Sequence, residues 1–515
     1  MKMSKRLIAL GLSAAMACTF FGCGKGNTNP ENADEPVSEV STGIDEIDFN
    51  IPYIRTSSLN PYKTDVEANL NIATLLFDSL FSVDNSFKAV PLVADSYTQN
   101  GGKINVKLKS VKFTDGSALT AEDVVYSFVQ AKGSSNYSSY LDNLTDCSQV
   151  NAGEVVFTMK NTNSYEAANL IFPIIKKGSD TGEAGAVTDN IPIGSGRYTV
   201  TTENGVKCLS CNKNRMGGYT PKYNKIGFKD SSDTSSISTL FAVGNIDMHC
   251  ENFSEGIFVR YTGTPSNKEM THFTFLGINN DRSVFSNIKV RRAMALLLDR
   301  EDIASVSFSG LATASSTPFS PSFYGLEGCT LPTMKQDKEA AIELLKEAGF
   351  KNLNADGVRY SDDSVLSLRL VVNHENTFRS AVARNIKEAF AKANISVTIT
   401  ELSYSDYIET VKAGEFDLYV GEVRLSNSFD LSHFFDGAQD ISVGINTDCA
   451  TAKKYKAFKN GTASMQEFLD TYADDLPFIS IAYRHGVAIR SDKIKTEIKP
   501  IVSDYFYNID EWTIE

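Results

Sequence analysis

The spacing of apolar residues predicts a regular alternation of strands and helices in the second half of the chain. Apolar residues recur at every second position in the expected strands and with helical spacing between them. In order, these elements are a strand at 366–372, a helix at 378–393, a strand at 397–399, a helix at 404–413 that Gly414 would end, and a strand at 416–423. This order predicts a parallel sheet with helices on its faces, and two further helices are expected before it, at 290–298 and 338–348.

The first half has a more mixed pattern. Asp45 to Asn60 begins as a strand, and the apolar residues between Asn69 and Leu80 have the spacing of a helix. A second helix is expected to begin at Thr120, a favourable N-cap, and to continue through Phe128. Short strands are expected at 89–93, 104–108, 155–159 and 206–213. The chain as a whole is therefore expected to have an α/β fold.

The first 22 residues have the features of a secretory signal peptide. Basic residues at positions 2, 5 and 6 are followed by an apolar run from 7 to 21, which is shorter than the helix of about 20 residues that spans a bilayer. The run ends in Phe20-Phe21-Gly22-Cys23, which resembles a bacterial lipobox with Phe20 in place of the usual Leu. We expect Cys23 to be acylated and to become the mature N-terminus. The alternative is an ordinary signal peptide in which Cys23 is incidental.

The segment after Cys23 predicts a flexible tether. Gly24 to Gly43 is rich in Gly, Asn, Glu, Ser and Thr and has almost no large apolar residue, so it cannot bury enough surface to offset the entropy of ordering. No later stretch approaches 18 consecutive apolar residues. The sequence therefore predicts a lipid-anchored body on the extracytoplasmic face of a bacterial membrane.

Length and charge narrow the possible partners. Removing residues 1–22 leaves 493 of the 515 residues, which suggests two or three lobes. The formal net charge of −13 becomes −16 without the three basic residues of the signal peptide. A chain this acidic is repelled by nucleic acid, so nucleic acid is excluded as the main partner.

The sequence offers few residues for catalysis or metal binding. Its five histidines, at 249, 272, 374, 433 and 485, are far apart, and no nucleophile elbow, phosphate-binding loop or dinucleotide fingerprint is present. Cys208 and Cys211 have a metal or redox spacing but lie in an expected strand without a second pair, so strand residues or one local disulfide are favoured. We therefore expect no catalytic residues, no bound metal and no cofactor, and a protein that is not an enzyme.

Several short motifs occur in a fixed order along roughly residues 45–490. The longest reads VKFTDG at 111–116 and LTAEDVVYSF at 119–128. The others are LNP at 59–61, LLFDSLF at 75–81, PLVADS at 91–96, PIGSGRY at 192–198, NN at 279–280, VRRAM at 290–294 with DR at 299–300, and the element at 341–350. Together they resemble the bacterial solute-binding protein family 5, the peptide, nickel and opine binders of ABC importers.

This resemblance implies a periplasmic-binding-protein-like α/β fold (class II, cluster C type). Two main lobes would be joined by a two-segment hinge and would close over the ligand, with an extra domain inserted in the first half. The implied boundaries are 45–70, 190–270 and 488–515 for a discontinuous domain I, 71–189 for domain II, and 271–487 for domain III. This division agrees with the contrast between a mixed first half and a regular second half.

The ligand site is expected near the loop after the strand that ends at Val423. Peptide-binding members of the family have a Trp and an Asp in this segment, and the Asp pairs with the peptide amino terminus; both are missing here from their expected places. Glu422 and Arg424 are two residues apart, so on a strand they face the same way and could bind the two ends of a zwitterion. The alternative is a solvated or mutual ion pair. Further candidate contacts are Ser426, Asn427, Ser58, Asn60 and Tyr324, although Ser58 and Asn60 could instead cap a turn and Tyr324 could be a packing residue.

The function implied is that of a substrate-binding protein of an ABC importer. The protein, expected to be a monomer, would capture a small organic solute and deliver it to permease and ATPase subunits. The favoured ligand is a di- or oligopeptide. Two alternatives remain with the same fold: a non-peptide ligand such as a nickel chelate, an opine or an oligosaccharide, and a role as a surface sensor.

Overall fold

The computed structural model divides the chain into two units, Met1–Ile44 and Asp45–Glu515. It describes residues 47–181, 191–203, 205–218, 220–231, 233–253, 256, 261–362, 364–437 and 440–515. The expected signal peptide, the acylated Cys23 and the tether lie outside these residues, so the description concerns the second unit. Within the described residues, no helix has the length and apolar character needed to cross a membrane.

A seven-stranded sheet dominates the part of the chain after residue 247. Its strand order is β11-β19-β12-β18-β16-β17, and β13 pairs with β19 beside this path. The strands are β11 (Met248–Glu251), β12 (Thr264–Ile278), β13 (Ala312–Ala314), β16 (Ser367–Asn373), β17 (Ser396–Leu402), β18 (Leu418–Arg424) and β19 (Phe478–Arg490).

The alternation predicted for the second half is confirmed. Strand β16 pairs in parallel with β17 and with β18. Helix α8 (Thr377–Ala391) connects β16 to β17, and α9 (Tyr404–Lys412) connects β17 to β18. Asn376 caps α8 by accepting a hydrogen bond from the backbone N–H of Arg379, and Gly414 follows α9 with a φ of 67° that suits glycine.

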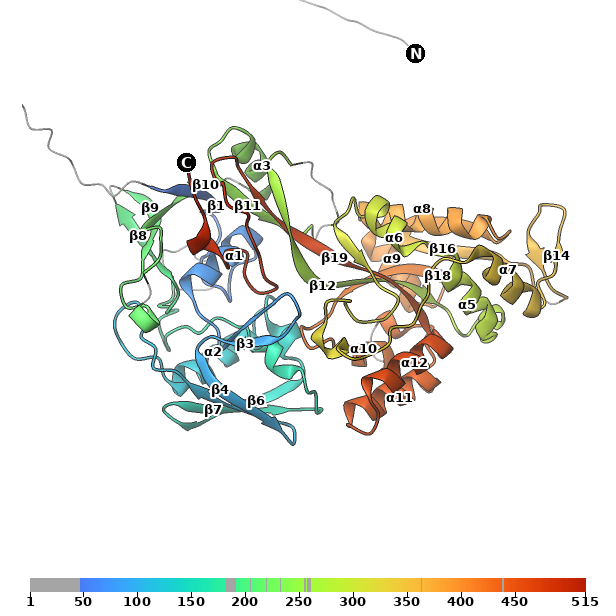
Figure 1. The fold of residues 1–515 in the computed structure, drawn as a ribbon, viewed down its shortest axis with the longest axis horizontal. Coiled ribbons are helices and arrows are strands. Elements are labelled where there is room, and N and C mark those ends of the chain that lie inside the picture. Colours follow the sequence, from blue (N-terminus) through green and yellow to red (C-terminus); the bar gives the residue numbers. More distant parts are fainter. Residues whose placement is uncertain are drawn as a thin grey trace, which may run out of the picture. The chain divides into compact units, whose positions relative to one another are not determined.

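Two long antiparallel strands, β12 and β19, run together through the centre of Figure 1 and were not expected from the sequence. They pair with each other over most of their length. At one end β11 pairs with β19, and at the other end β18 pairs with β12. The pairing of β12 with β19 shifts register between Lys268 and His272, which marks a β-bulge. These two strands are therefore the continuous connection between the two parts of this sheet.

The first half contains two four-stranded sheets, in the orders β1-β10-β9-β8 and β4-β5-β7-β6. The strands of the first are β1 (Phe49–Tyr53), β8 (Tyr198–Glu203), β9 (Val206–Cys211) and β10 (Lys225–Asp230). Those of the second are β4 (Ala94–Asn100), β5 (Lys103–Leu108), β6 (Leu144–Asn151) and β7 (Glu154–Met159). Small pairs are formed by β2 (Phe81–Val83) with β3 (Ala89–Pro91) and by β14 (Asn352–Leu353) with β15 (Arg359–Tyr360).

The helix predicted at 69–80 is shorter than expected and begins earlier. Helix α1 runs from Glu67 to Leu76, and Phe77 is already extended. Gly196 explains where it ends, because its N–H donates to the carbonyl of Leu76 and any Cβ at Gly196 would collide with the backbone of that residue. The N-terminal prediction for α2 (Ala121–Lys132) is confirmed, since Thr120 and Asp123 form a capping box.

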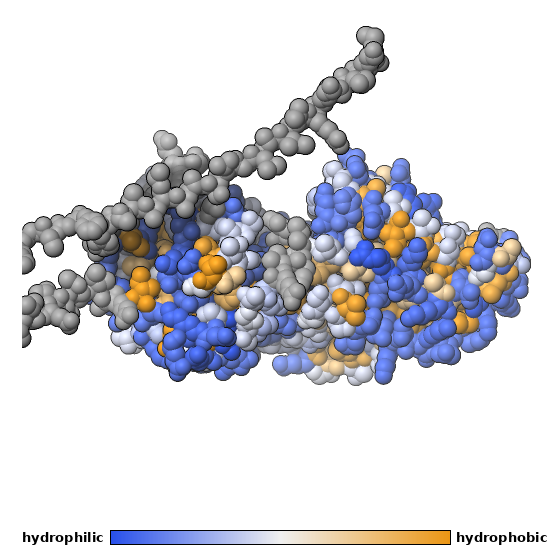
Figure 2. Space-filling view, turned by 90° about the horizontal axis from the view of Figure 1, so that it is seen from above, coloured by the Kyte–Doolittle hydropathy of each residue, from blue (hydrophilic) through white to orange (hydrophobic). Residues whose placement is uncertain are grey.

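The remaining helices cover the sheets and surround their ends. They are α3 (Thr234–Ala242), α4 (Ser283–Ser286), α5 (Ile288–Leu297), α6 (Arg300–Asp302), α7 (Lys338–Glu347), α10 (Ser432–Phe435), α11 (Ala450–Lys459) and α12 (Met465–Asp475), with short helical turns η1 (Ser138–Leu141), η2 (Glu166–Asn169) and η5 (Tyr324–Leu326). Trp512 is a core residue: it is fully buried, and its ring centroid lies 5.6 Å from that of Phe49. On the face shown in Figure 2, hydrophobic residues form small separate patches among hydrophilic ones.

Candidate functional site

A cavity of about 200 Å³ brings together segments that are far apart in the sequence. Helix α1 supplies Leu70, Asn71, Ala73 and Thr74. Strand β12 supplies Lys268, and strand β18 supplies Arg424. The other lining residues are Phe77, Ser79, Ser82, Leu92, Asn136, Tyr137, Tyr140, Ile171, Pro173, Val502, Ser503 and Asp504. By the predicted boundaries, all three domains contribute, and Arg424 is the only lining residue from domain III.

Lys268 is opposite Gly486 at the last pair of β12 and β19 before the bulge. Its ammonium nitrogen lies 4.2 Å from the centre of the Tyr505 ring, at a cation–π distance. Within the described chain, Lys268 makes no side-chain hydrogen bond and no ion pair. Burial lowers the pKa of Lys268, and Glu67 opposes this effect.

Arg424 ends β18 and reaches η1. Its guanidinium donates a hydrogen bond of 3.1 Å to Ser139 Oγ and lies 5.2 Å from the centre of the Tyr140 ring. Among the described residues no carboxylate forms an ion pair with Arg424, and its side chain remains exposed. The guanidinium is therefore positioned at the cavity while most of its hydrogen-bonding capacity is left for another group.

The only carboxylate of the cavity lining belongs to Asp504. It pairs with Arg197 at 2.6 Å, and both side chains are largely buried. Its other oxygen accepts a hydrogen bond of 2.9 Å from Thr74 Oγ1. Asp504 is thus already neutralised by a partner, whereas the two cations of the lining are not.

A row of basic side chains crosses three adjacent strands beside the cavity. His272 of β12 lies directly opposite Arg424 of β18 on one side and Arg484 of β19 on the other. Residues opposite each other in a sheet project from the same face, so these three side chains share one face. Burial lowers the pKa of His272 to about 3, so it is neutral, and the charge of this row comes from the two arginines.

Glu422 lies on the same face as Arg424, as predicted, but it is engaged within the protein. Its carboxylate accepts a hydrogen bond of 3.0 Å from Arg484 and lies 4.0 Å from Arg379. Burial alone would raise the pKa of Glu422, but Arg484 and Arg379 outweigh it and hold the value at about 2. Glu422 and Arg424 therefore do not pair with each other, and a role of Glu422 in binding a ligand amine remains a prediction.

A second acidic group, Glu67 at the start of α1, interacts electrostatically with Lys268. Burial and the nearby Glu251 raise the pKa of Glu67 to about 8, although Lys268 and Arg484 oppose the shift. At neutral pH Glu67 is thus mostly protonated. It consequently supplies little negative charge to balance Lys268.

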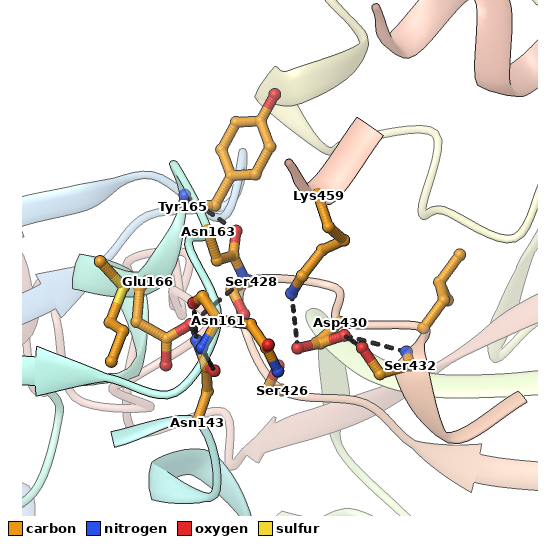
Figure 3. A network of polar contacts seen from close by, with 12 residues as sticks. Asn143, Asn161, Asn163, Tyr165, Glu166, Ser426, Ser428, Asp430, Ser432 and Lys459 are labelled. Atoms are coloured by element: carbon orange, nitrogen blue, oxygen red, sulfur yellow. Dashed lines mark hydrogen bonds and ion pairs between the residues drawn. The ribbon is translucent and has the colours of Figure 1, made fainter. Parts of the chain in front are cut away.

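Ser426 and Asn427 follow β18, and Asn427 contacts the segment 163–169. Asn427 is buried and donates to the carbonyl of Ala168 at 3.0 Å, while Ser426 and Ser428 share a hydrogen bond of 3.0 Å. Ser428 Oγ accepts a bond of 3.0 Å from Asn169, which in turn donates to the fully buried Glu166. Figure 3 shows this network, in which Glu166 also faces Asn143 and Asn163, and Asp430 faces Lys459 and Ser432. Neither Ser426 nor Asn427 lines the cavity, and their ligand-binding role remains a prediction.

The three other predicted site residues also lie outside the cavity lining. Ser58 Oγ accepts from the N–H of Asn60, and Asn60 Oδ1 accepts from the N–H of Tyr62, so both make the bonds of a turn. Tyr324 packs edge-on against Tyr165 with ring centres 5.3 Å apart. Lys268 was missed by sequence reasoning because the stretch Thr264–Glu269 is polar and resembles a loop.

The other candidate sites are metal ligands, paired cysteines and three larger hollows. In the described part of the chain, no group of three or more His, Cys, Asp or Glu residues could hold a metal ion, and the six cysteines there are free thiols. Cys208 and Cys211 are thus strand residues of β9, without the local disulfide. One hollow of about 430 Å³ is lined by residues 298–301, 314–316 and 332–336, all within predicted domain III. Two others, of about 420 and 580 Å³, are lined by residues 55–56 with residues between 230 and 240 and by Thr114 with residues between 199 and 225.

Comparison with known proteins adds sequence evidence to this geometry. The sequence profile of the bacterial extracellular solute-binding proteins, family 5 Middle, matches residues 88–439. The oligopeptide-binding protein AppA of Bacillus subtilis is 24% identical over 543 residues, covering 98% of this chain and 98% of AppA. The glutathione-binding protein GsiB of Pectobacterium atrosepticum is 24% identical over 477 residues, covering 85% of this chain and 88% of GsiB.

Solved structures share the fold. The structure of AppA from Bacillus subtilis in complex with a nonapeptide aligns with a TM-score of 0.58 and 22% identity, covering 91% of this chain and 98% of AppA. NikA from Brucella suis in complex with Fe(III)-EDTA aligns with a TM-score of 0.68 and 17% identity, covering 91% of this chain and 99% of NikA. The expected periplasmic-binding-protein-like fold is therefore confirmed.

Proposed function

The chain belongs to family 5 of the bacterial extracellular solute-binding proteins, and from this premise we propose that it captures a short peptide for an ABC importer. The ligand would enter the cavity between α1, β12 and β18 and leave chemically unchanged. The protein would then act as a binding component and not as an enzyme.

The observation that carries this proposal is the cavity itself. Its lining joins three predicted domains, and the hydrogen bond between Thr74 and Asp504 joins residues 430 positions apart. A site made where lobes meet can close over a ligand and remove it from water, which gives affinity without any chemical step. Family membership and the position of the cavity between the predicted domains therefore support the same activity.

Short peptides are favoured over long ones by the size of the cavity. Its volume of about 200 Å³ lies below the roughly 300–1,000 Å³ of typical small-molecule sites. AppA and GsiB, by their names, bind oligopeptides and glutathione. A short peptide or a peptide-like molecule is the ligand that agrees with both facts.

A non-peptide ligand is a second candidate because the segment after β18 lacks the Trp and Asp expected of the peptide-binding members. NikA from Brucella suis was solved with Fe(III)-EDTA, a chelate that carries carboxylates. A chelate of this kind needs cationic partners, and Lys268 and Arg424 would supply them.

The cellular setting completes the proposal. The body would be held at the outer face of the bacterial membrane by a lipid on Cys23, with residues 24–43 as a tether, and would deliver its ligand as a monomer to permease and ATPase subunits. Labelling with a radioactive fatty acid tests the anchor: wild-type protein should become labelled, and Cys23→Ala should not. Label retained by Cys23→Ala would contradict acylation at this residue.

Recovery of the natural ligand tests the binding function. The protein is purified without denaturant, unfolded, and the released small molecules are identified by mass spectrometry. We expect a stoichiometric short peptide whose re-addition raises the unfolding temperature, by an amount that corresponds to about 2.7 kcal/mol at 100 times Kd. A substitution that fills the cavity, Asn71→Trp, should abolish co-purification, whereas Lys387→Trp on the exposed side of α8 should not. Chemical conversion of the added peptide would contradict the proposal.

A further inference from the structure

The segment after β18 is hydrogen-bonded to the first half of the chain. Asn427 Nδ2 donates a hydrogen bond of 3.0 Å to the carbonyl of Ala168, and Asn169 Nδ2 donates one of 3.0 Å to Ser428 Oγ. In each bond the two partners are 259 positions apart in the chain. Ser428 is among the residues that Figure 3 labels. We call the contact formed by these four residues the clasp.

An aromatic pair lies beside the clasp. The ring of Phe429 packs edge-on against that of Phe87, in the turn between β2 and β3, with ring centres 4.8 Å apart. Both rings are buried, and the exposed fractions of Asn427 and Ser428 are only 1% and 3%. The hydrogen bonds of the clasp are therefore shielded from water, which strengthens them.

The clasp continues directly into two walls of the cavity. Arg424 precedes Asn427 by three residues, Ile171 follows Asn169 by two, and both Arg424 and Ile171 line the cavity. Because a chain spans at most about 3.6 Å per residue, these two wall residues lie within about 11 Å of the clasp along the backbone. The distance between the walls consequently depends on whether the clasp is closed.

The closed clasp also contains unfavourable features, as expected of a contact that can open. Asn169 Oδ1 is buried and accepts no hydrogen bond within the described part of the chain. Phe429 and Phe87 have φ angles of 52° and 63°, in the left-handed region that is strained for residues other than glycine. An unsatisfied buried acceptor and a strained backbone both oppose closure. The clasp is therefore weaker than a core contact without these features.

We propose, resting on the solute-binding function above, that the clasp limits the length of the peptide that the cavity accepts. While the clasp is closed, the walls at Arg424 and Ile171 are held together and only a short peptide fits the volume of about 200 Å³. A longer peptide binds only the open form, in which these walls have moved apart. The step involves no change of covalent bonds.

Short and long peptides then respond differently to a weaker clasp. A ligand that binds only the open form has an apparent affinity reduced by the fraction of molecules that are open. Loss of the two hydrogen bonds should raise that fraction about tenfold, and the affinity for long peptides should rise by the same factor. A short peptide binds the closed form and gains nothing from opening.

The test uses the full chain, purified without denaturant, and the double variant Asn427→Ala/Ser428→Ala. The probes are randomised mixtures of di-, tri-, penta- and heptapeptides with free amino and carboxyl ends. Retained peptides are selected by mass spectrometry, and their affinities are measured by calorimetry. We expect the wild type to select di- and tripeptides. In the double variant, the affinity for penta- and heptapeptides relative to the selected tripeptide should rise about tenfold.

A matched control separates the clasp from a general loss of stability. Asn279 is also buried, and its Nδ2 also donates to backbone carbonyls, those of Gly414 and Phe416, but all three residues belong to predicted domain III. Asn279→Ala should therefore keep the wild-type preference for length. Ser428→Ala alone removes only one hydrogen bond and replaces the double variant if that protein does not fold, with a smaller rise expected.

Hydrogen exchange in the ligand-free protein gives a readout that needs no peptide. The backbone amides of residues 425–429 should exchange about tenfold faster in the double variant than in the wild type, because local opening becomes more frequent. The same amides should exchange at the wild-type rate in Asn279→Ala. Unchanged exchange in the double variant would show that the clasp does not control opening, and it would overturn the proposal.

The other contrary results have separate meanings. Equal relative affinities for long peptides in the wild type and the double variant would overturn the length limit but leave solute binding standing. A wild-type preference for heptapeptides would do the same without any variant. An equal rise in Asn279→Ala would overturn the assignment to the clasp. Retention of no peptide by either protein would overturn it too, and the co-purified ligand then decides the proposed function separately.

Discussion

Arg424 donates a hydrogen bond of 3.1 Å to Ser139, although the two residues are 285 positions apart in the chain. One belongs to β18 of the large sheet and the other to η1, beside the four-stranded sheet that contains β6. The bond therefore joins two segments that are distant in the sequence at the edge of the cavity. If β18 and η1 moved relative to each other, the position of the Arg424 side chain at the cavity would change.

The first prediction concerns this arginine. Arg424→Ala should weaken binding of the free-acid tripeptide selected above by about 10- to 100-fold, because hydrogen bonds to charged groups contribute about 1.5–3 kcal/mol. The unfolding temperature should hardly change, since the side chain is exposed. Calorimetric titration measures the affinity, and Arg384→Ala on the outer surface of α8 is the control. An unchanged affinity would remove Arg424 from the site.

The second prediction concerns the ion pair between Glu422 and Arg484. Glu422→Gln should lower the free energy of unfolding by about 3 kcal/mol, because it leaves the buried guanidinium of Arg484 without a carboxylate. Urea unfolding measures the loss. Glu343→Gln breaks an exposed pair with Lys346 and should cost less than about 1 kcal/mol.

The pH dependence of Glu422 supplies the matching check. Its pKa is depressed to about 2, so its stabilising effect is complete above the unfolded pKa of about 4.3 and is lost as the pH falls toward 2. The difference between wild type and Glu422→Gln should shrink over that range. A difference that is constant from pH 6 to pH 3 would show that the ion pair does not cause it.

Sequence patterns predicted the parallel part of the large sheet because its signals are local. Apolar residues recur at alternate positions in these strands, and each helix has an amphipathic face with a capping residue or a glycine at its end. Thr120 pairs with Asp123 at the start of α2, Asn376 caps the start of α8, and Gly414 follows the end of α9. Their effects do not depend on the rest of the fold.

The central strands β12 and β19 could not be predicted in the same way. Polar residues begin β12, and Arg484, His485 and Gly486 interrupt the apolar run of β19, so neither has a simple period. Arg484, His485 and Gly486 are buried because three strands and the C-terminal segment pack around them. Gly486 leaves room for the Tyr505 hydroxyl, because a Cβ at this position would lie too close to that oxygen. The role of Lys268 depends on this long-range packing, which explains why the sequence indicated Arg424 but not Lys268.

The third prediction concerns the network around Glu166. Glu166→Ala should cost about 3 kcal/mol of stability, because the side-chain amides of Asn143, Asn163 and Asn169 would lose their shared acceptor in a buried site. Denaturant unfolding gives this value. Glu154→Ala, which loses one exposed bond to Asn151, is the control and should cost less than about 1 kcal/mol. Equal losses in the two variants would show that the network does not stabilise the fold.

The last prediction follows from the raised pKa of Glu67. With a pKa of about 8 in the folded protein and about 4.3 in the unfolded chain, Glu67 stabilises the fold fully only below about pH 4, and this stabilisation is lost as the pH rises to 8. Glu67→Gln keeps the neutral form at every pH. It should therefore match wild type near pH 4 and exceed it increasingly up to pH 8.

Thermal unfolding between pH 4 and pH 9 measures this difference. We expect Glu67→Gln to be more stable by about 2 kcal/mol above pH 8, which is less than the full shift implies because the side chain keeps some solvent exposure. Glu388→Gln, on the exposed side of α8, should follow the wild-type curve. If the curves for Glu67→Gln and wild type were parallel from pH 4 to pH 9, Glu67 would be ionised in the folded protein. It would then act as a counter-ion of Lys268, and the cavity would no longer carry the positive charge that a ligand carboxylate requires.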